Sequence, residues 1–482
     1  MKHIKYTFKG EVLACFPGRE FVLTKNPQID CCYGFMWPIP FITILSKEKG
    51  QTFIATSPWI HAVHLHKKEK ELELIFDFEK EERVEIYSHR ANFKEGIQIY
   101  QSYFKKTYGS LPEMSEAIQN SFRVRRIFFH SDFCQENISD LSLEGILEQD
   151  EKEIGGVDIG LFFDYAYNPE TKIRCGNEPP YTFQAKSRIN GCKSKLNKTY
   201  AYFDPYLVQY QSPMDHYRNS LQMKDKKNQK IRVWGNKQWH PYLLDEKWME
   251  YSKKCMDYAK EIYQVDGIYL DEIGNGNQYP LNKQAQIEME KEYVEDIHKI
   301  HSDLMCEFAP IDQMVSNFSI VLSDTCSIVN IYRFVFPQIR FIRIVHCDYP
   351  MGHSEYELNK SFFNGEGLWI DGDSKNQTWY PDSMKEKIKK QYQILKEYAA
   401  CFSSIDCEPL YRIYNEFVLC HRFASKDQTL FTLLNTSDKN IPIDLEKPME
   451  MIYPEKKMVS TIRIEAKEVI VLKNTEESQC YL

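Results

Sequence analysis

Short runs of alternating hydrophobic and polar residues fill the first hundred or so residues of the chain. Polar turns separate the runs, a pattern typical of half-buried strands. The clearest runs cover residues 41–46, 52–57, 61–66 and 72–78. A helical pattern follows over residues 96–109 and ends at Gly109. The pattern therefore predicts a β-rich N-terminal region, residues 1–110, that closes with a linking helix.

From about Phe122 the pattern changes, and strand-like runs alternate with helix-like runs. The strand candidates are residues 125–130, 157–165, 198–207, 265–272, 303–310, 319–324, 338–345 and 365–370. Several are apolar on both faces, as expected for parallel strands covered by helices. The alternation predicts a (β/α)8 TIM barrel over residues 111–405, in the α/β class. An open doubly wound sheet is the alternative, but no glycine-rich turn follows residues 125–130.

The predicted helices have regular apolar stripes and recognisable starts. Within residues 245–264, apolar and aromatic residues recur at spacings of three and four, at Trp248, Tyr251, Cys255, Tyr258 and Ile262. Asp245 is expected to cap this helix. In residues 381–402, Ser383 and Glu386 form a capping-box pattern at the start of another helix.

A third pattern begins near residue 410, where short strand-like runs and turn residues return. We expect residues 406–482 to form a small antiparallel β-sandwich. The pattern thus predicts a barrel between two β-rich regions.

Composition narrows the function. The 61 Lys and Arg against 69 Asp and Glu give a net charge of −8. With no basic stripe, neither nucleic acid nor an anionic membrane is an expected partner. No apolar run resembles a signal peptide or a membrane span, and the 14 cysteines are scattered. We expect a cytoplasmic protein with reduced thiols. The sequence does not indicate the oligomeric state.

Acidic residues stand at or near the ends of successive predicted barrel strands. They are Asp164, Asp204, Asp271, Glu272, Glu307 and Asp324. In a TIM barrel these ends face the active site. Glycoside hydrolysis needs two carboxyl groups at such a site. Asp271 and Glu307 are separated by one predicted helix, so we expect them on neighbouring strands.

Asp271 and Glu272 cannot both face the cleft if strand alternation persists. We expect Asp271 to face it, and Glu272 to orient a neighbour or cap the following turn. Any of these acids can instead cap a helix or pair with an arginine, and the sequence leaves that structural explanation open.

The segment "VDGIYLDEIG" (265–274) resembles the fourth-strand motif of retaining α-glycoside hydrolases built on this barrel. The chain more closely resembles bacterial glycoside-hydrolase-like proteins related to the endo-α-N-acetylgalactosaminidases. That resemblance covers about residues 110–480 and depends on the segments 249–274, "CEFAPIDQMV" (306–315), "YRFVFP" (332–337) and "FNGEGLW" (363–369). It implies that Asp271 is the nucleophile and Glu307 the acid/base.

The chain departs from those relatives in two ways. Its N-terminal β-rich region is shorter than theirs. The segment around Glu307 also gives the acid assignment only local support, so Asp312 and Asp324 are alternative proton donors.

Other residues are candidates for substrate binding, because aromatic faces stack on sugar rings and polar groups bind hydroxyls. Aromatic residues make up 14% of the chain. Each candidate can equally well serve packing or structural pairing. The full set is Asp164, Tyr165, Asp204, Tyr206, Trp239, His240, Glu272, Asp312, Asp324, Arg340 and Trp369.

The leading hypothesis is a retaining glycoside hydrolase that acts on α-linked carbohydrate without a cofactor or metal. One alternative is a catalytically inactive carbohydrate-binding protein on the same barrel. Another is a metal-dependent hydrolase, but no His-x-His motif follows the first barrel strand, where His130 stands alone.

Overall fold

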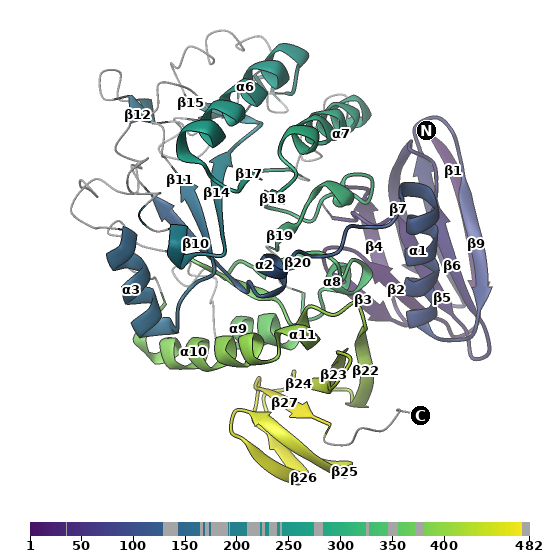
Figure 1. The fold of residues 1–482 in the computed structure, drawn as a ribbon. Coiled ribbons are helices and arrows are strands. Elements are labelled where there is room, and N and C mark those ends of the chain that lie inside the picture. The colour runs from purple at the N-terminus through teal and green to yellow at the C-terminus, as the bar shows by residue number, and fades with distance from the viewer. Residues whose placement is uncertain are drawn as a thin grey trace.

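A computed structural model gives the arrangement of the chain. It describes residues 1–34, 36–128, 143–163, 167–168, 173–174, 191, 193–209, 222–223, 227–230, 239–241, 243–273, 283–323, 327–345, 355–371 and 380–474. The predicted barrel is present and closed, with eight parallel strands in sequence order (Figure 1). The strands are β10 (Arg123–Phe128), β11 (Ile159–Phe163), β14 (Lys198–Phe203), β17 (Gly267–Leu270), β18 (Leu304–Cys306), β19 (Ile320–Ser323), β20 (Arg340–Arg343) and β21 (Gly367–Ile370). Closure rules out the open doubly wound sheet.

Side chains alternate between the inside and the outside of the barrel. On β17, Tyr269 belongs to the interior cluster, whereas Ile268 and Leu270 belong to the larger cluster that includes residues of the surrounding helices. Strand geometry gives this alternation. Asp271 comes two residues after Tyr269, which places it on the interior side.

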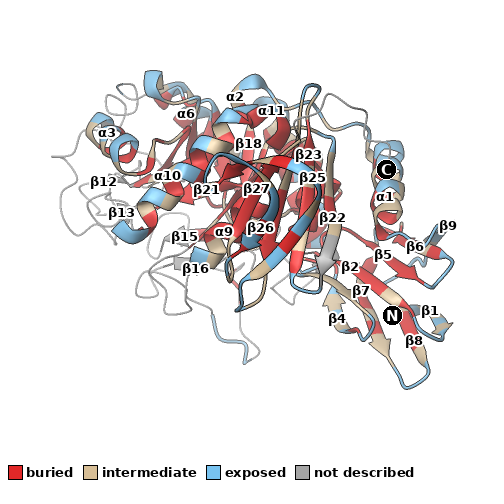
Figure 2. Cartoon of the chain, turned by 90° about the horizontal axis from the view of Figure 1, so that it is seen from below, coloured by how far each residue is buried: buried red, intermediate tan, exposed pale blue. Residues whose placement is uncertain are grey.

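The helices α3 (Leu143–Ile154), α6 (Glu246–Tyr263), α7 (Lys283–Ile300), α8 (Ile331–Val335), α9 (Glu355–Phe363), α10 (Asp382–Glu397) and α11 (Ala399–Phe402) accompany the barrel strands. The longer ones have exposed outer faces and buried inner faces (Figure 2). Asp245 caps α6 as predicted, since its side chain accepts a hydrogen bond from Trp248 N at 3.2 Å. The predicted capping box at Ser383 is wrong. Helix α10 begins at Asp382 directly after Pro381, so Ser383 lies within the first turn, and no side chain caps the helix.

The N-terminal region contains two antiparallel sheets and one helix, α1 (Phe93–Tyr108). One sheet has the order β1 (Lys2–Lys9), β8 (Glu71–Phe78), β7 (Ile60–Lys67) and β4 (Gln28–Cys32). The other has the order β3 (Phe21–Thr24), β2 (Leu13–Pro17), β5 (Phe41–Leu45), β6 (Gly50–Ala55) and β9 (Val84–His89). Helix α1 packs on the second sheet at Gly96, where an added Cβ would lie 2.2 Å from Thr43 Oγ1. Only glycine permits this close approach.

The C-terminal strands form one six-stranded antiparallel sheet. Its order is β22 (Cys407–Asn415), β23 (Val418–Ala424), β24 (Thr429–Asn435), β27 (Val469–Lys473), β25 (Ile441–Tyr453) and β26 (Lys457–Ile464). Alternate residues of β24 and β27 pack toward the barrel core, and the others join a separate cluster with residues of β25 and β26. Strands β24 and β27 are therefore buried on both faces, whereas β25 and β26 have many exposed residues. None of the described helices is long and apolar enough to cross a membrane.

Candidate active site

Asp271 and Glu307 lie side by side at the carboxyl end of the barrel. Strands β17 and β18 are parallel neighbours, with Leu270 opposite Cys306, so the two acids follow at matching positions. Asp271 N donates to Phe203 O at 2.8 Å, and Glu307 N donates to Leu270 O at 3.3 Å. The barrel hydrogen bonding thus extends to both residues and fixes their backbones.

The surroundings of Glu307 favour the protonated form of its carboxyl group. Burial, then the charge of Asp271 and a side-chain hydrogen bond to Asp271, raise the pKa of Glu307 well above its usual range. Two carboxyl groups this close cannot both ionise readily, and one keeps its proton. Glu307, whose pKa is raised, is therefore the group that keeps the proton. Among the described residues, no ion pair neutralises either acid.

Tyr269 holds the second hydrogen bond to the Asp271 carboxylate. Its hydroxyl donates to Asp271 Oδ1 at 2.7 Å, and the residue is 2% exposed. Burial, followed by the charges of Asp271 and Glu307, raises the pKa of Tyr269 well above its usual range, so its hydroxyl stays protonated as a donor. Tyr269 therefore orients the Asp271 side chain from the interior of the barrel.

An aromatic layer supports these acids inside the barrel. Among the described residues, the Tyr269 ring has three aromatic neighbours, with centroid distances of 5.9 Å to Tyr202, 6.0 Å to Phe163 and 6.4 Å to Trp369. Trp369 is only 4% exposed, so much of its ring packs in this layer, beneath the acids. Layered side chains of this kind fill TIM barrels.

Glu272 differs from Asp271 in its contact with Glu307. Its backbone has φ of 59°, which is unusual for a residue other than glycine. In this conformation its N–H donates to Glu307 Oε2 at 3.2 Å. The backbone N–H of Glu272 thus helps to position Glu307, and a role for the Glu272 side chain stays a prediction.

Asp204 is a third acid in the cluster, directly after β14. Its Oδ1 accepts from Tyr206 N at 2.7 Å and Leu207 N at 2.8 Å, which fixes the turn after the strand. Burial, then the charges of Asp271 and Glu272, raise its pKa well above the usual range. Tyr206 itself is 2% exposed and lies close to Glu290 on α7, on the helix side of the barrel. That position does not suit a substrate contact.

Two predicted site residues lie elsewhere. Asp312 is 1% exposed and accepts hydrogen bonds from Tyr33 and Tyr100 of the N-terminal region. Arg340 is the first residue of β20, at the amino end of the barrel. It donates to Gln119 O at 3.0 Å, on the short helix α2 (Glu116–Gln119), and to Ser403 Oγ at 2.5 Å. Both predictions of substrate contact are therefore corrected, because these residues serve packing between segments.

Asp164, Tyr165 and Asp324 lie outside the described residues. Trp239 and His240 form β16 (Trp239–Pro241), which pairs with β15 (Leu207–Gln209) beyond the end of β14. Their backbones thus lie near the carboxyl end of the barrel, and their side chains are outside the description.

The sequence reasoning missed Tyr269, Tyr202, Arg126 and Asp371. Arg126 Nε donates to Asp371 Oδ1 at 2.6 Å, and its guanidinium lies 5.6 Å from the centre of the Trp369 ring. A signal was present in the sequence, because an aromatic residue occurs two positions before a strand-end acid four times, at Phe162 and Asp164, Tyr202 and Asp204, Tyr269 and Asp271, and Trp369 and Asp371. Residues two apart share a strand face.

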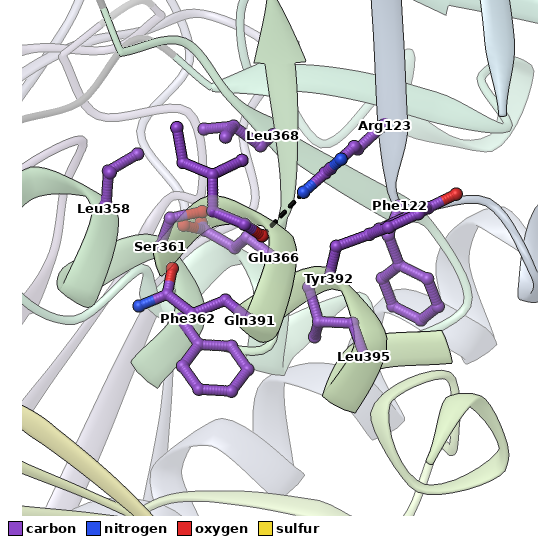
Figure 3. A pocket seen from close by; sticks show the side chains of 11 residues that line it. Phe122, Arg123, Leu358, Ser361, Phe362, Glu366, Leu368, Gln391, Tyr392 and Leu395 are labelled. Atoms are coloured by element: carbon purple, nitrogen blue, oxygen red, sulfur yellow. Dashed lines mark hydrogen bonds between the residues drawn. The ribbon is translucent and has the colours of Figure 1, made fainter. Parts of the chain in front are cut away.

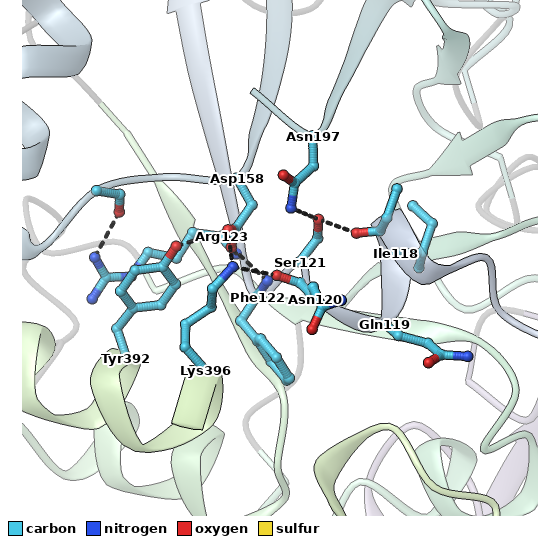
Figure 4. Close-up of polar contacts among 12 residues, drawn as sticks. Ile118, Gln119, Asn120, Ser121, Phe122, Arg123, Asp158, Asn197, Tyr392 and Lys396 are labelled. Carbon is cyan, nitrogen blue, oxygen red and sulfur yellow. Dashed lines mark hydrogen bonds and ion pairs between the residues drawn. The ribbon is translucent and has the colours of Figure 1, made fainter. Parts of the chain in front are cut away.

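The amino end of the barrel has a different character. Asp158 Oδ2 accepts from Phe122 N and Arg123 N, and its Oδ1 accepts from Tyr392 and Lys396 (Figure 4). A small, mostly apolar pocket lies nearby, lined by residues of β10, β21, α9 and α10 (Figure 3). Arg123 in its wall donates to Ile388 O at 2.6 Å. Asp158 thus accepts hydrogen bonds from four donors, as expected of a carboxylate with a structural role. No group of three or more His, Cys, Asp or Glu in the described part of the chain has the geometry of a metal site.

Comparisons with known proteins give similarity in structure only. No protein family model and no curated protein matches the chain. The galactosidase domain of the α-galactosidase–sucrose kinase AgaSK is 9% identical, with a TM-score of 0.62 over 97% of this chain and 74% of that one. The GH36 α-galactosidase AgaA from Geobacillus stearothermophilus is 9% identical, with a TM-score of 0.62 over 98% of this chain and 76% of that one. An α-galactosidase from Lactobacillus brevis is 10% identical, with a TM-score of 0.62 over 99% of this chain and 76% of that one. At these identities the likeness establishes the fold, which this chain shares with α-galactosidases over nearly its whole length.

Proposed function

We propose that this protein is a retaining glycoside hydrolase for α-linked carbohydrate, with Asp271 as nucleophile and Glu307 as acid/base. The main support is the position of Asp271 and Glu307 at matching ends of adjacent barrel strands, together with the raised pKa of Glu307. A double displacement requires two such carboxyl groups, one as the nucleophile and one as the acid/base. The shared fold with α-galactosidases supports the same reaction class.

In the first step, an Asp271 oxygen attacks the anomeric carbon while the Glu307 proton passes to the glycosidic oxygen. The bond to the leaving group breaks, and a β-linked glycosyl ester forms on Asp271. Tyr269 occupies Oδ1 of Asp271, which leaves Oδ2 for the attack. In the second step, the Glu307 carboxylate takes a proton from water, the water oxygen attacks the anomeric carbon, and Asp271 departs with the α-configuration restored.

The hydrogen bond between the two acids has a consequence for substrate binding. Carboxyl groups of retaining enzymes lie about 5–5.5 Å apart, farther than a direct hydrogen bond allows. Glu307 must therefore turn away from Asp271 when a sugar enters. If it does not turn, Asp324, the residue after β19, is the alternative proton donor, and Glu307 instead orients Asp271.

The neighbours' activities suggest the first substrates. α-Galactosides follow from the α-galactosidases of the same fold, and α-N-acetylgalactosaminides follow from the sequence resemblance. Nitrophenyl derivatives of both sugars, with α-glucosides and the β-anomers as comparisons, form the initial panel.

The test combines stereochemistry with chemical rescue. NMR of the first-formed sugar should show retained α-configuration. Asp271→Gly should lose turnover and, with azide, give the β-glycosyl azide. Glu307→Ala should keep activity on dinitrophenyl substrates and give the α-glycosyl azide. Asp296→Asn is a matched control, since Asp296 lies on α7 in a surface ion pair with Lys253.

Three outcomes would change the assignment. Turnover by Asp271→Gly without azide contradicts the nucleophile. If Asp324→Ala and not Glu307→Ala gives the α-azide, the proton donor is Asp324. Sugar binding by calorimetry without turnover of any panel substrate favours the non-catalytic carbohydrate-binding protein.

A further inference from the structure

The segment that follows Glu307 runs from the barrel to the N-terminal region. Hydrogen bonds hold its backbone at Phe308, Pro310 and Asp312. Phe308 O accepts from Cys306 Sγ at 3.2 Å, and Pro310 O accepts from the Tyr332 hydroxyl at 2.5 Å. Asp312 N then donates to Pro38 O at 3.0 Å. Because Pro38 belongs to the N-terminal region, this last hydrogen bond makes that region contribute to the position of the segment.

The strongest contacts of the segment are those of the Asp312 side chain. Oδ1 accepts from the Tyr33 hydroxyl at 2.6 Å, and Oδ2 accepts from the Tyr100 hydroxyl at 2.7 Å. Asp312 is 1% exposed, and a buried carboxylate is stable only when donors replace the lost water. The N-terminal region supplies these two donors.

Both tyrosines are held rigidly. Tyr100 on α1 stacks on Phe41, with ring centroids 4.7 Å apart and planes at 20°. Tyr33 meets the edge of Trp37, with centroids 6.2 Å apart and planes at 85°. Both tyrosines are at most 1% exposed. Because the rings cannot turn, their hydroxyls fix Asp312 in one place.

We propose that Asp312 is a positioning residue for Glu307. By accepting hydrogen bonds from Tyr33 and Tyr100, it fixes residues 308–312 and thereby the direction from which Glu307 reaches Asp271. The N-terminal region is then part of the catalytic unit. This inference deepens the proposed function and rests on it for its catalytic consequence only.

The test removes the donors and keeps the packing. The double variant Tyr33→Phe/Tyr100→Phe retains both rings and deletes both hydroxyls. Gln101→Ala is the matched control, because Gln101 Nε2 also joins α1 to the barrel, through Phe334 O and Val335 O at 3.1 Å each, without touching residues 307–312. Asp312→Asn is the conservative variant, since its amide oxygen still accepts from one tyrosine.

Hydrogen exchange is the first readout, because it does not require activity. In the double variant, amides of residues 307–314 should exchange at least about tenfold faster, while β19 to β21 keep their protection. Asp312→Asn should lie between this variant and the wild type, and Gln101→Ala should leave residues 307–314 unchanged. On an active substrate, kcat of the double variant should fall about tenfold with KM within about twofold.

Two results would overturn the proposal. One is unchanged exchange at residues 307–314 in the double variant. The other is an equal increase in Gln101→Ala, which would mean general loosening of the interface. If the wild type hydrolyses no glycoside, the proposed function fails, but exchange and NMR titration of the Glu307 carboxyl still decide whether Asp312 fixes its position.

Discussion

The Tyr269 hydroxyl lies 2.7 Å from Asp271 Oδ1, two residues away on the same face of β17. The contact depends on strand geometry alone, because residues i and i+2 point to the same side. It gives Asp271 a fixed orientation and places a neutral donor against its carboxylate.

Removing the Tyr269 hydroxyl should slow the reaction and leave the fold intact. Tyr269→Phe keeps the ring contacts with Phe163 and Tyr202 but frees Oδ1 of Asp271. We expect kcat to fall about tenfold to a hundredfold, since a misoriented nucleophile is costly. Steady-state kinetics on the best substrate measure the loss. Tyr202→Phe is the control, because its hydroxyl lies 3.4 Å from Asp204, and a fall of equal size there would contradict a specific role for Tyr269.

The pH dependence of activity should report Glu307. Its pKa is raised well above the usual range by burial first and by Asp271 second. The protonated form donates the proton, so kcat/KM should fall as pH rises through the raised pKa. In Asp271→Asn, NMR titration should show the Glu307 pKa lower than in the wild type but still raised, because burial remains. Titration of the wild-type group near its ordinary value of 4.5 would contradict the assignment.

Asp312 should make the protein less stable as pH rises. Burial raises its pKa from 3.8 to about 6, although the tyrosine hydroxyls oppose the shift. The folded state thus holds the proton more tightly than the unfolded state. The stabilisation is complete below pH 3.8 and is lost as pH rises through about 6, a difference equivalent to about 3 kcal/mol.

Urea unfolding between pH 4 and 7 measures this dependence. Asp312→Asn should flatten the pH dependence by about that 3 kcal/mol. The exposed Asp427→Asn should not alter it. An unchanged slope in Asp312→Asn would show that the Asp312 carboxyl has similar proton affinity in both states.

The network at the amino end should affect stability alone. Asp158→Ala leaves the Phe122 and Arg123 N–H groups, the Tyr392 hydroxyl and Lys396 without their acceptor. We expect the free energy of unfolding to fall by about 3 kcal/mol, and Tyr392→Phe to cost about 1 kcal/mol. Denaturant titration measures both. At 25 °C the folded fraction should keep wild-type kcat, and a changed KM would contradict the separation of the two ends.

Much of the fold follows from the sequence. All eight barrel strands overlap the predicted runs, because a strand buried on both faces leaves a continuous apolar segment. The adjacency of Asp271 and Glu307 also follows, since one helix between two strands makes them parallel neighbours.

Other positions depend on facts that the local pattern does not contain. Arg340 lies inside the predicted strand of residues 338–345. In the structure β20 begins at Arg340 itself, two residues later than predicted, so Arg340 lies at the amino end of the barrel. Asp312 comes six residues after Cys306, the last residue of β18, where the chain has already turned to the N-terminal region. Such a partner, about 200 to 280 residues away in sequence, leaves no periodic signal.

In the described part of the barrel, the aromatic layer closes the interior beneath the acids. Tyr269 and Trp369 fill the barrel where a channel would otherwise run, and each is at most 4% exposed. Under the proposed mechanism, neither the leaving group nor the attacking water passes through this layer, so both exchange on the side of the strand ends. A second sugar waiting on that side would compete with water for the glycosyl ester. The closed floor therefore favours transfer of the glycosyl group to an acceptor sugar when such acceptors are concentrated.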